Sequence, residues 1–131
     1  MTDIIYGPVD ATVKKWLATR LLTVAVYMAM PKAPPPQVVL VSLVSGGPAA
    51  RADLPLTRYR LSFDCIAKTR DDASALSRRV MTELVELGDG GGQVVDGVYL
   101  GGADILLYRW QPDPDSDLPR YIVDALITTV H

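Results

Sequence analysis

The sequence predicts a single α+β domain over residues 1–131, in which an antiparallel or mixed β-sheet has two helices packed on one face. At 131 residues and 49% hydrophobic side chains, the chain can bury one core without disulfides or metals. Two segments show the apolar spacing of an amphipathic helix, and several others alternate with the period of two that is typical of strands. Their order of helix, strands, helix and strands indicates the α+β class.

Residues 10–21 are predicted to form the first helix. Asp10 is a favourable N-cap residue at its start. The apolar side chains after it recur at spacings of three and four: Val13, Trp16, Leu17 and Leu21. Because this spacing places side chains on one side of a helix, we expect that side to pack on the core.

Two strands and two loops are predicted to follow. Residues 23–30 are mixed with some β-branching, and the prolines after them predict that this strand ends in a stiff loop or a hairpin tip. Residues 38–44 are predicted to form a largely buried strand. Residues 45–55 contain two glycines and two prolines, which favours a mobile exposed loop over regular structure.

Residues 59–67 form the clearest predicted strand, because apolar side chains alternate there with mostly polar ones. Thr69 is predicted to cap the second helix, with Asp71 and Asp72 in the first turn. The apolar stripe of this helix consists of Ala73, Leu76, Val80, Leu84 and Leu87. Gly88 is predicted to end the helix as a left-handed C-terminal cap.

The last third of the chain is predicted to consist of strands. Residues 94–100 and 105–110 are predicted as two strands joined through a glycine pair, and Gly97 suggests a bulge or a close neighbour. An acidic loop bounded by prolines follows over residues 112–119. Residues 120–129 alternate but have apolar side chains on both faces, which predicts a strand that is central or covered at an interface.

The composition excludes several classes of function. Thirteen Lys and Arg against fifteen Asp and Glu give a net charge of −2, so we expect no specific nucleic-acid binding. The single cysteine and single histidine cannot build a Cys/His zinc site or an ordinary Cys-His or Ser-His catalytic pair. The longest apolar stretch, residues 21–30, is too short for a membrane span. We therefore expect no enzyme, no cofactor, no metal and no membrane insertion.

Asp113, Asp115 and Asp117 alternate along the predicted acidic loop, and Asp124 is twelfth when Asp113 counts as first. This is the acidic skeleton of a calcium loop. However, Leu118 stands where such a loop needs glycine, and the flanking segments are predicted strands instead of helices. The pattern favours a solvated turn, and a small ligand-binding or calcium-binding module stays an alternative function.

Three segments share their layout with a known family of proteins. They are the amphipathic start over residues 9–21, the strand-to-helix unit over residues 59–84, and residues 110–123, where an Asp-Pro turn leads into an Arg-Tyr strand. In this layout the chain resembles the tail terminator proteins of long-tailed bacteriophages, also called tail completion or head-tail joining proteins. The resemblance covers most of the chain and implies a small α+β subunit of similar length.

The resemblance implies a structural virion protein that is assembled in the bacterial host cytoplasm and located at the head-proximal end of the phage tail. There it forms a homo-oligomeric ring, commonly a hexamer, that stops polymerisation of the major tail tube protein and joins the tail to a head-tail connector or stopper protein. Another connector or minor tail component is the alternative within this class. An acidic ring suits a channel through which DNA passes, because like charges disfavour binding to phosphates.

The contact residues are assigned from their expected exposure. For contacts between subunits we expect polar residues of the clearest strand and apolar residues of the last one: Arg58, Arg60, Asp64, Ile122 and Leu126. For contacts with the tube or connector we expect charged residues of the proline-rich and glycine-rich loops: Lys32, Arg51 and Asp53. The acidic candidates for the lumen of the ring are Asp89, Asp113, Asp115 and Asp117.

Overall fold

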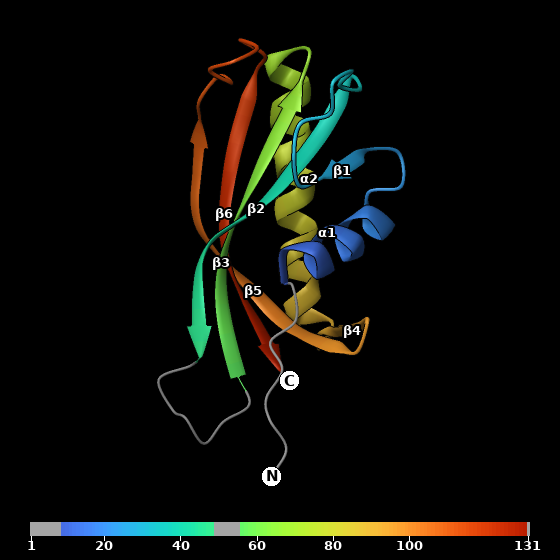
Figure 1. Ribbon diagram of the computed structural model, residues 1–131, viewed down its shortest axis with the longest axis vertical. Coiled ribbons are helices and arrows are strands. Elements are labelled where there is room, and N and C mark those ends of the chain that lie inside the picture. The colour runs from blue at the N-terminus through green and yellow to red at the C-terminus, as the bar shows by residue number, and fades with distance from the viewer. Residues whose placement is uncertain (1–8, 49–55, 131) are drawn as a thin grey trace.

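The computed structural model of the protein describes residues 9–48 and 56–130. Its elements are α1 (Val9–Arg20), β1 (Ala25–Tyr27), β2 (Gln37–Pro48), β3 (Leu56–Ala67), α2 (Arg70–Asp89), β4 (Gln93–Val95), β5 (Val98–Trp110) and β6 (Arg120–Val130). The strands form one sheet in the order β1-β2-β3-β6-β5-β4, and both helices pack against it (Figure 1). Strand β1 is parallel to β2 and the other neighbours are antiparallel. The predicted α+β class with a mixed sheet is confirmed.

The hydrophobic core lies between the helices and one face of the sheet. On β3, the alternate residues Tyr59, Leu61, Phe63 and Cys65 are buried in it. All the apolar positions predicted for both helices are buried as well. The opposite face of the sheet buries a smaller group outside this core, which includes Val38, Ile66 and Ile122. Strand β6 lies between β3 and β5, so the prediction of a central last strand is confirmed.

Ion pairs connect helix α1 to α2 and to the turn between β4 and β5. Arg20 Nε donates to Glu83 Oε2 of α2 at 2.8 Å, and Lys15 Nζ donates to Asp96 Oδ1 in the β4–β5 turn at 2.9 Å. Because these side chains are exposed or partly exposed, water screens the pairs and they contribute little to stability. The buried apolar side of α1 therefore does most to hold it on the sheet. No helix in residues 9–48 and 56–130 is long and apolar enough to cross a membrane.

Helix α2 begins as predicted and ends later than predicted. The Thr69 hydroxyl accepts a hydrogen bond from the Asp72 amide at 3.1 Å, so the predicted N-cap is confirmed. The prediction of Gly88 as the C-terminal cap is wrong, because the helix continues to Asp89 and Gly90 caps it. Gly88 instead faces Gly102 of β5, and the absence of a side chain on Gly102 allows the two elements to approach closely. A Cβ built on Gly102 of β5 would lie only 3.3 Å from the Cα of Gly88.

The β4–β5 region also differs from the prediction. The chain reverses at Asp96 and Gly97, which both have positive φ values, 49° and 80°. This Asp-Gly pair fits a tight hairpin turn. Strand β5 then runs without interruption through the glycine pair that was predicted to separate two strands. It does so because a bulge between Leu100 and Gly102 absorbs the irregularity, and β5 bends away from the hairpin (Figure 1).

Strands β1 and β2 correct two further predictions. Only Ala25–Tyr27 of the predicted first strand is regular, and it pairs in parallel with β2. The proline-rich segment is therefore not a hairpin tip, because a parallel partner requires a connection that returns along the sheet. Residues 45–48 belong to β2 instead of the predicted loop, and the rest of that loop lies outside the described residues. Gly46 allows this, because a Cβ there would overlap with the Tyr59 ring.

Candidate interaction surfaces

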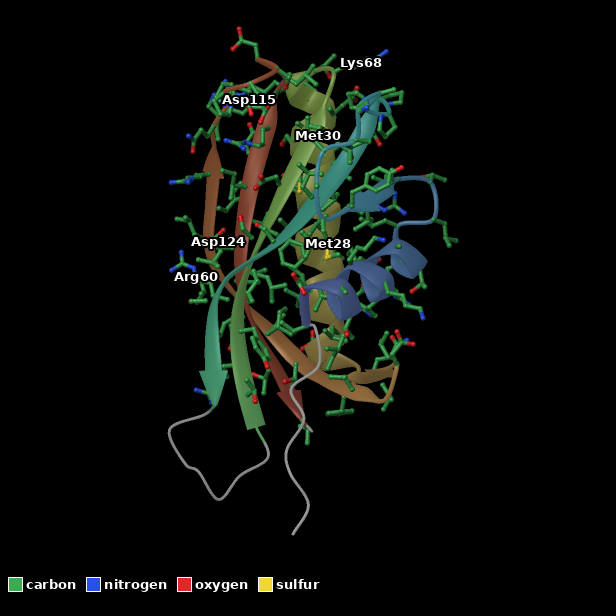
Figure 2. The ribbon with its side chains drawn as sticks, viewed as in Figure 1. Met28, Met30, Arg60, Lys68, Asp115 and Asp124 are labelled. Atoms are coloured by element: carbon green, nitrogen blue, oxygen red, sulfur yellow. The ribbon has the colours of Figure 1, made fainter. Side chains whose placement is uncertain are left out.

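Two ion pairs cross from β3 to β6 on the face of the sheet that the helices leave uncovered. Arg60 Nη2 donates to Asp124 Oδ2 at 2.7 Å, and Figure 2 shows these two side chains close together on that face. Arg60 lies opposite Leu126 in the register and Ser62 lies opposite Asp124, so the pair is diagonal. Asp124 is 7% exposed, and its Oδ1 has no hydrogen-bond partner among the described residues. The Arg60 charge therefore compensates a nearly buried carboxylate.

The second pair joins Asp64 to Arg120 with the same diagonal offset, at 3.4 Å between Asp64 Oδ2 and Arg120 Nη1. Burial raises the pKa of Asp64, and the nearby Arg120 charge offsets this only in part. Arg120 also lies 3.6 Å from Asp113 of the acidic loop. This arrangement links the centre of the sheet to the loop that precedes β6.

The acidic loop is a turn held by its own hydrogen bonds. Asp113 Oδ2 accepts from the Ser116 amide at 2.9 Å and from the Ser116 hydroxyl at 2.6 Å, and the side-chain bond lowers the pKa of Asp113 most. The Asp113 amide donates to the Leu118 carbonyl at 2.9 Å. Within residues 9–48 and 56–130, no three His, Cys, Asp or Glu side chains come together as a metal-binding group. The structure thus does not gather these aspartates as a calcium loop requires.

The residues predicted to contact other subunits lie in different surroundings. Arg60 and Asp64 are both engaged in ion pairs within their own chain. Ile122 is buried, Leu126 is half-buried and Arg58 is exposed. Their role between subunits stays a prediction, and Arg58 is the member of the set that a partner reaches most easily.

The predicted loop and lumen residues are dispersed over the molecule. Lys32 is exposed between β1 and β2, whereas Arg51 and Asp53 lie outside the described residues. Asp89 is the last residue of α2, beside β4. Asp115 lies at the opposite end of the molecule, with Asp113 and Asp117 in the same loop (Figures 1 and 2). The structure does not bring Asp89 together with the other three acids, and their position in a ring stays a prediction.

Cys65 is fully buried in the core. Burial raises the pKa of its thiol, and the neighbouring Asp64 charge raises it further. A thiol with a raised pKa carries little thiolate at neutral pH, which is the form that reacts as a nucleophile. Cys65 therefore fits the packing role that its position in an alternating strand predicts.

Two stretches of sheet edge have no neighbouring strand, and the sequence analysis did not identify them. Strand β1 covers only Val38–Leu40 of β2, and β4 covers only Val98–Leu100 of β5. Beyond these points no strand of the described residues pairs with the outer side of residues 41–48, here named the β2 open edge, or with the outer side of residues 102–110, the β5 open edge. On their inner sides these residues pair with β3 and β6. Their uncharged runs, residues 41–48 and 105–108, are the sequence signal that could have indicated them.

Both open edges expose large apolar side chains. On the β2 open edge, Leu43 is 48% exposed and Val44 is 52% exposed. On the β5 open edge, Leu106 is 49% exposed, and Leu107 and Tyr108 are exposed beside it. Each edge also contains a bulge, between Leu43 and Ser45 on β2 and between Ile105 and Leu107 on β5. Each open edge is therefore a stretch of strand with exposed apolar side chains and, among the described residues, no neighbouring strand on its outer side.

The β5 open edge borders a groove of about 640 Å³ between α2 and the sheet. Its lining includes Val85 of α2 and Ala103 and Ile105 of β5, and the close contact of Gly88 with Gly102 lies at one end. Val85 is exposed in it. The part of the groove beside Ala103 and Ile105 lies on the helix-covered side of the sheet, because these residues pair with the core residues Ile127 and Ala125. The lining also includes the polar residues Asp89, Asp104 and Thr128.

An aromatic cluster fixes the far end of the β5 open edge. The rings of Tyr108 and Tyr121 stack with centroids 5.4 Å apart, and Trp110 lies 5.1 Å from Tyr121. The Arg70 guanidinium at the start of α2 lies 4.3 Å over the Trp110 ring. The Tyr108 and Ser77 hydroxyls are 3.0 Å apart. The end of β5, whose outer side has no strand partner among the described residues, is thus anchored on α2 before any other protein binds.

No protein-family model and no curated protein matches the chain. Among solved structures, a chain from the virion of a native gene transfer agent (GTA) particle is similar to it, with a TM-score of 0.60. The superposition covers 88% of this chain and 84% of that chain, at 22% sequence identity. The chain shares the fold of that virion chain. At this level of identity, the likeness concerns the fold.

Proposed function

We propose that the chain is a structural protein of a phage-like virion, with no enzymatic activity. The observation that carries this proposal is the fold it shares with a chain of the gene transfer agent virion over most of both chains. The sequence resemblance to phage tail terminators supports it independently, because it rests on segment layout and residue pattern. Fold alone does not define function, so the proposal depends on both lines together.

Within the virion, the protein forms a ring, commonly of six copies, at the head-proximal end of the tail tube. The ring stops polymerisation of the major tail tube protein and joins the tail to the head connector. Head-to-tail contacts that close on themselves leave no free end, which is how a ring can block further addition to a tube. The open edges of the sheet support such a role, because their exposed apolar side chains offer surface for other protein chains.

The contact residues follow the sequence assignment with one refinement from the structure. Arg58 is exposed, whereas Arg60 compensates the buried Asp124 within its own chain. Arg58→Glu is therefore the cleaner test of a polar subunit contact, and we expect it to weaken ring formation and to leave folding intact. Lys32, Arg51 and Asp53 are proposed to face the tube or connector. The acids of residues 113–117 and Asp89 are proposed to face the channel.

The experiment that tests this function is polymerisation of the tube protein from the same particle in the presence of the purified chain. Negative-stain electron microscopy measures tube length, and a gold label on the chain shows its position. We expect tubes to stop growing, with the label at one end of each tube. Continued growth with the label along the walls or in solution would contradict the proposal. A label at one end with unchanged growth would indicate another connector or minor tail component.

A further inference from the structure

We propose that the β5 open edge of one copy pairs antiparallel with the β2 open edge of the next copy, so that one β-sheet continues from subunit to subunit. This inference rests on the ring of the proposed function and specifies the contact that would build it. The partner is a second copy of this chain. The evidence consists of the lack of edge protection, the strand directions, and the fit between an apolar side chain and a groove.

The centres of the two open edges lack two of the devices that usually prevent strands from pairing with other proteins, namely charges and prolines, whereas Asp104, Arg109 and Pro48 lie toward the ends of the edges. Such devices are charged side chains, especially lysine, prolines within the edge, and very short edge strands. Here the three-residue strands β1 and β4 protect only one part of each edge. The exposed centres, Ser42–Gly46 and Ile105–Tyr108, contain no charge and no proline. Bulges are a further such device and both edges contain one, but outward-facing backbone groups on either side of each bulge have no strand partner within the described part of the chain.

The directions of the strands fit a head-to-tail contact. Strand β2 is antiparallel to β3, β3 to β6, and β6 to β5. Strand β5 therefore runs opposite to β2 within one subunit. When a second copy extends the sheet and keeps the same strand direction, its β2 lies antiparallel to β5 of the first copy. This is the more stable of the two pairing modes per residue.

The side chains fit the same arrangement. Leu43 lies opposite the core residue Leu61 in the register, so it points to the helix side of the sheet. It is nevertheless half exposed. In the continuous sheet, Leu43 of the next copy faces the groove beside Val85 and Ile105. An apolar side chain without cover is thus brought to the apolar part of the groove, which Val85 and Ile105 line.

A two-fold contact, in which β5 pairs with β5 of a partner, is the main alternative. It would give the β5 open edge a strand partner but leave the β2 open edge without one, with Leu43 and Val44 still exposed. It would also place two grooves together with no side chain from β2 to fill them. The head-to-tail contact uses both edges in every copy, so the observations favour it.

Cross-linking tests which edges meet. The chain with Leu43→Cys and Leu106→Cys is treated with a short bismaleimide. Cys65 does not react with it, because this residue is fully buried. We expect a ladder of covalent multimers from this double variant. We expect none from either single variant, nor from the matched control Leu43→Cys/Val94→Cys, in which the second cysteine lies on the exposed strand β4. Dimers from Leu106→Cys alone, or no multimers from any variant, would overturn the inference.

A charge exchange provides a second readout that does not depend on linker reach. Val44→Lys and Leu106→Glu each place a charge on one open edge, and we expect each to raise the concentration for half-assembly by about tenfold or more. Combined in one chain, they place Lys against Glu at every head-to-tail contact, and we expect assembly to recover. If the double variant does not recover assembly although circular dichroism shows that it is folded, the inference is overturned. That outcome would fit a two-fold contact of β5 with β5, which places Glu against Glu.

The outcomes separate this inference from the proposed function. A closed ring without cross-links between Leu43→Cys and Leu106→Cys would reject the edge pairing and leave the ring at the tube end standing. A covalent ladder from a chain that does not stop tube growth would reject the function and leave the edge pairing standing.

Discussion

The two halves of β2 contain similar apolar side chains, which are mostly buried in the first half and partly exposed in the second. In the first half, β1 pairs with Val38–Leu40, and Val39 is completely buried in the core. In the second half, no strand of the described chain pairs on the outside, and Leu43 and Val44 are about half exposed. Similar residues therefore serve folding in one half and are available for assembly in the other. The positions of the helices and of the short strand β1 decide whether a given residue of β2 is covered within its own chain or left exposed.

Strand β5 repeats this division. The β4 hairpin covers its beginning, where Leu100 is buried, whereas Leu106, Leu107 and Tyr108 lie on the open edge. The comparison teaches that stability and assembly depend on separate parts of the same strands. Substitutions in the covered regions should change the free energy of unfolding, and substitutions on the open edges should change the oligomeric state.

The largest effect is expected in the covered region. Phe63 is completely buried between the sheet and the helices. Phe63→Ala removes its packing and leaves a cavity, so we expect a loss of about 3–5 kcal/mol in the free energy of unfolding. Urea unfolding followed by circular dichroism measures this. A loss below about 1 kcal/mol would show that the core is not where the comparison places it.

The ion pair of the uncovered face should have a smaller effect. Arg60→Ala leaves the Asp124 carboxylate nearly buried without its partner, and we expect a loss of about 2 kcal/mol, moderated because Arg60 itself is partly exposed. Arg58→Ala is the matched control on the same face of β3 and should cost about 0.5 kcal/mol or less. Equal losses from the two variants would mean that Arg60 does not compensate Asp124.

The acidic loop should contribute less and with a defined pH dependence. The lowered pKa of Asp113 means that its contribution to stability is present above its unfolded pKa and is lost as the pH falls through the folded value. We expect Asp113→Ala to cost about 1 kcal/mol at pH 7 and progressively less in acid. Asp115→Ala, in the same loop and exposed, is the control.

The contribution of Asp64 to stability changes with pH in the opposite direction, since burial raises the pKa of this carboxyl group. Its ionisation therefore costs stability as the pH rises through that pKa. Asp64 is present in both the wild-type chain and Asp113→Ala, so most of its contribution cancels in their difference. The part that remains is the small rise in the Asp64 pKa that the Asp113 charge causes. A difference that grows as the pH falls would contradict the assignment of the turn.

The smallest effect on unfolding is expected at the open edge. Leu106→Glu exposes a charge where the side chain already lies in solvent, so we expect the free energy of unfolding of the monomer to change by about 0.5 kcal/mol or less. The same variant is expected to weaken assembly, and native mass spectrometry over a concentration series would show this. A loss comparable to that of Phe63→Ala would remove the distinction between the two regions.

Periodicity predicted most of the fold. The buried sides of both helices, the Thr69 cap and the central last strand were readable because each depends on residues that are near in sequence. Several of the errors concern glycines. Gly88 and Gly102 were interpreted as breaks, whereas they face each other where α2 approaches β5. A single sequence does not show which distant backbone a glycine will meet.

The surfaces were less predictable than the fold. The ion pair between Arg60 and Asp124 depends on β3 lying beside β6, and strand order is not encoded in local patterns. The open edges depend on where β1 and β4 stop covering their neighbours. The uncharged run over residues 105–108 gave a signal for exposure only once its place at an edge was known.

The measurement that tests the central claim most directly is the native mass of the purified full chain, with negative-stain images of the same sample. The claim that the open edges join copies head to tail predicts a closed ring, and six copies of the 14.2 kDa chain amount to about 85 kDa. A chain that stays a monomer or a two-fold dimer at every concentration up to about 1 mM, a range covering weak protein contacts, would contradict it.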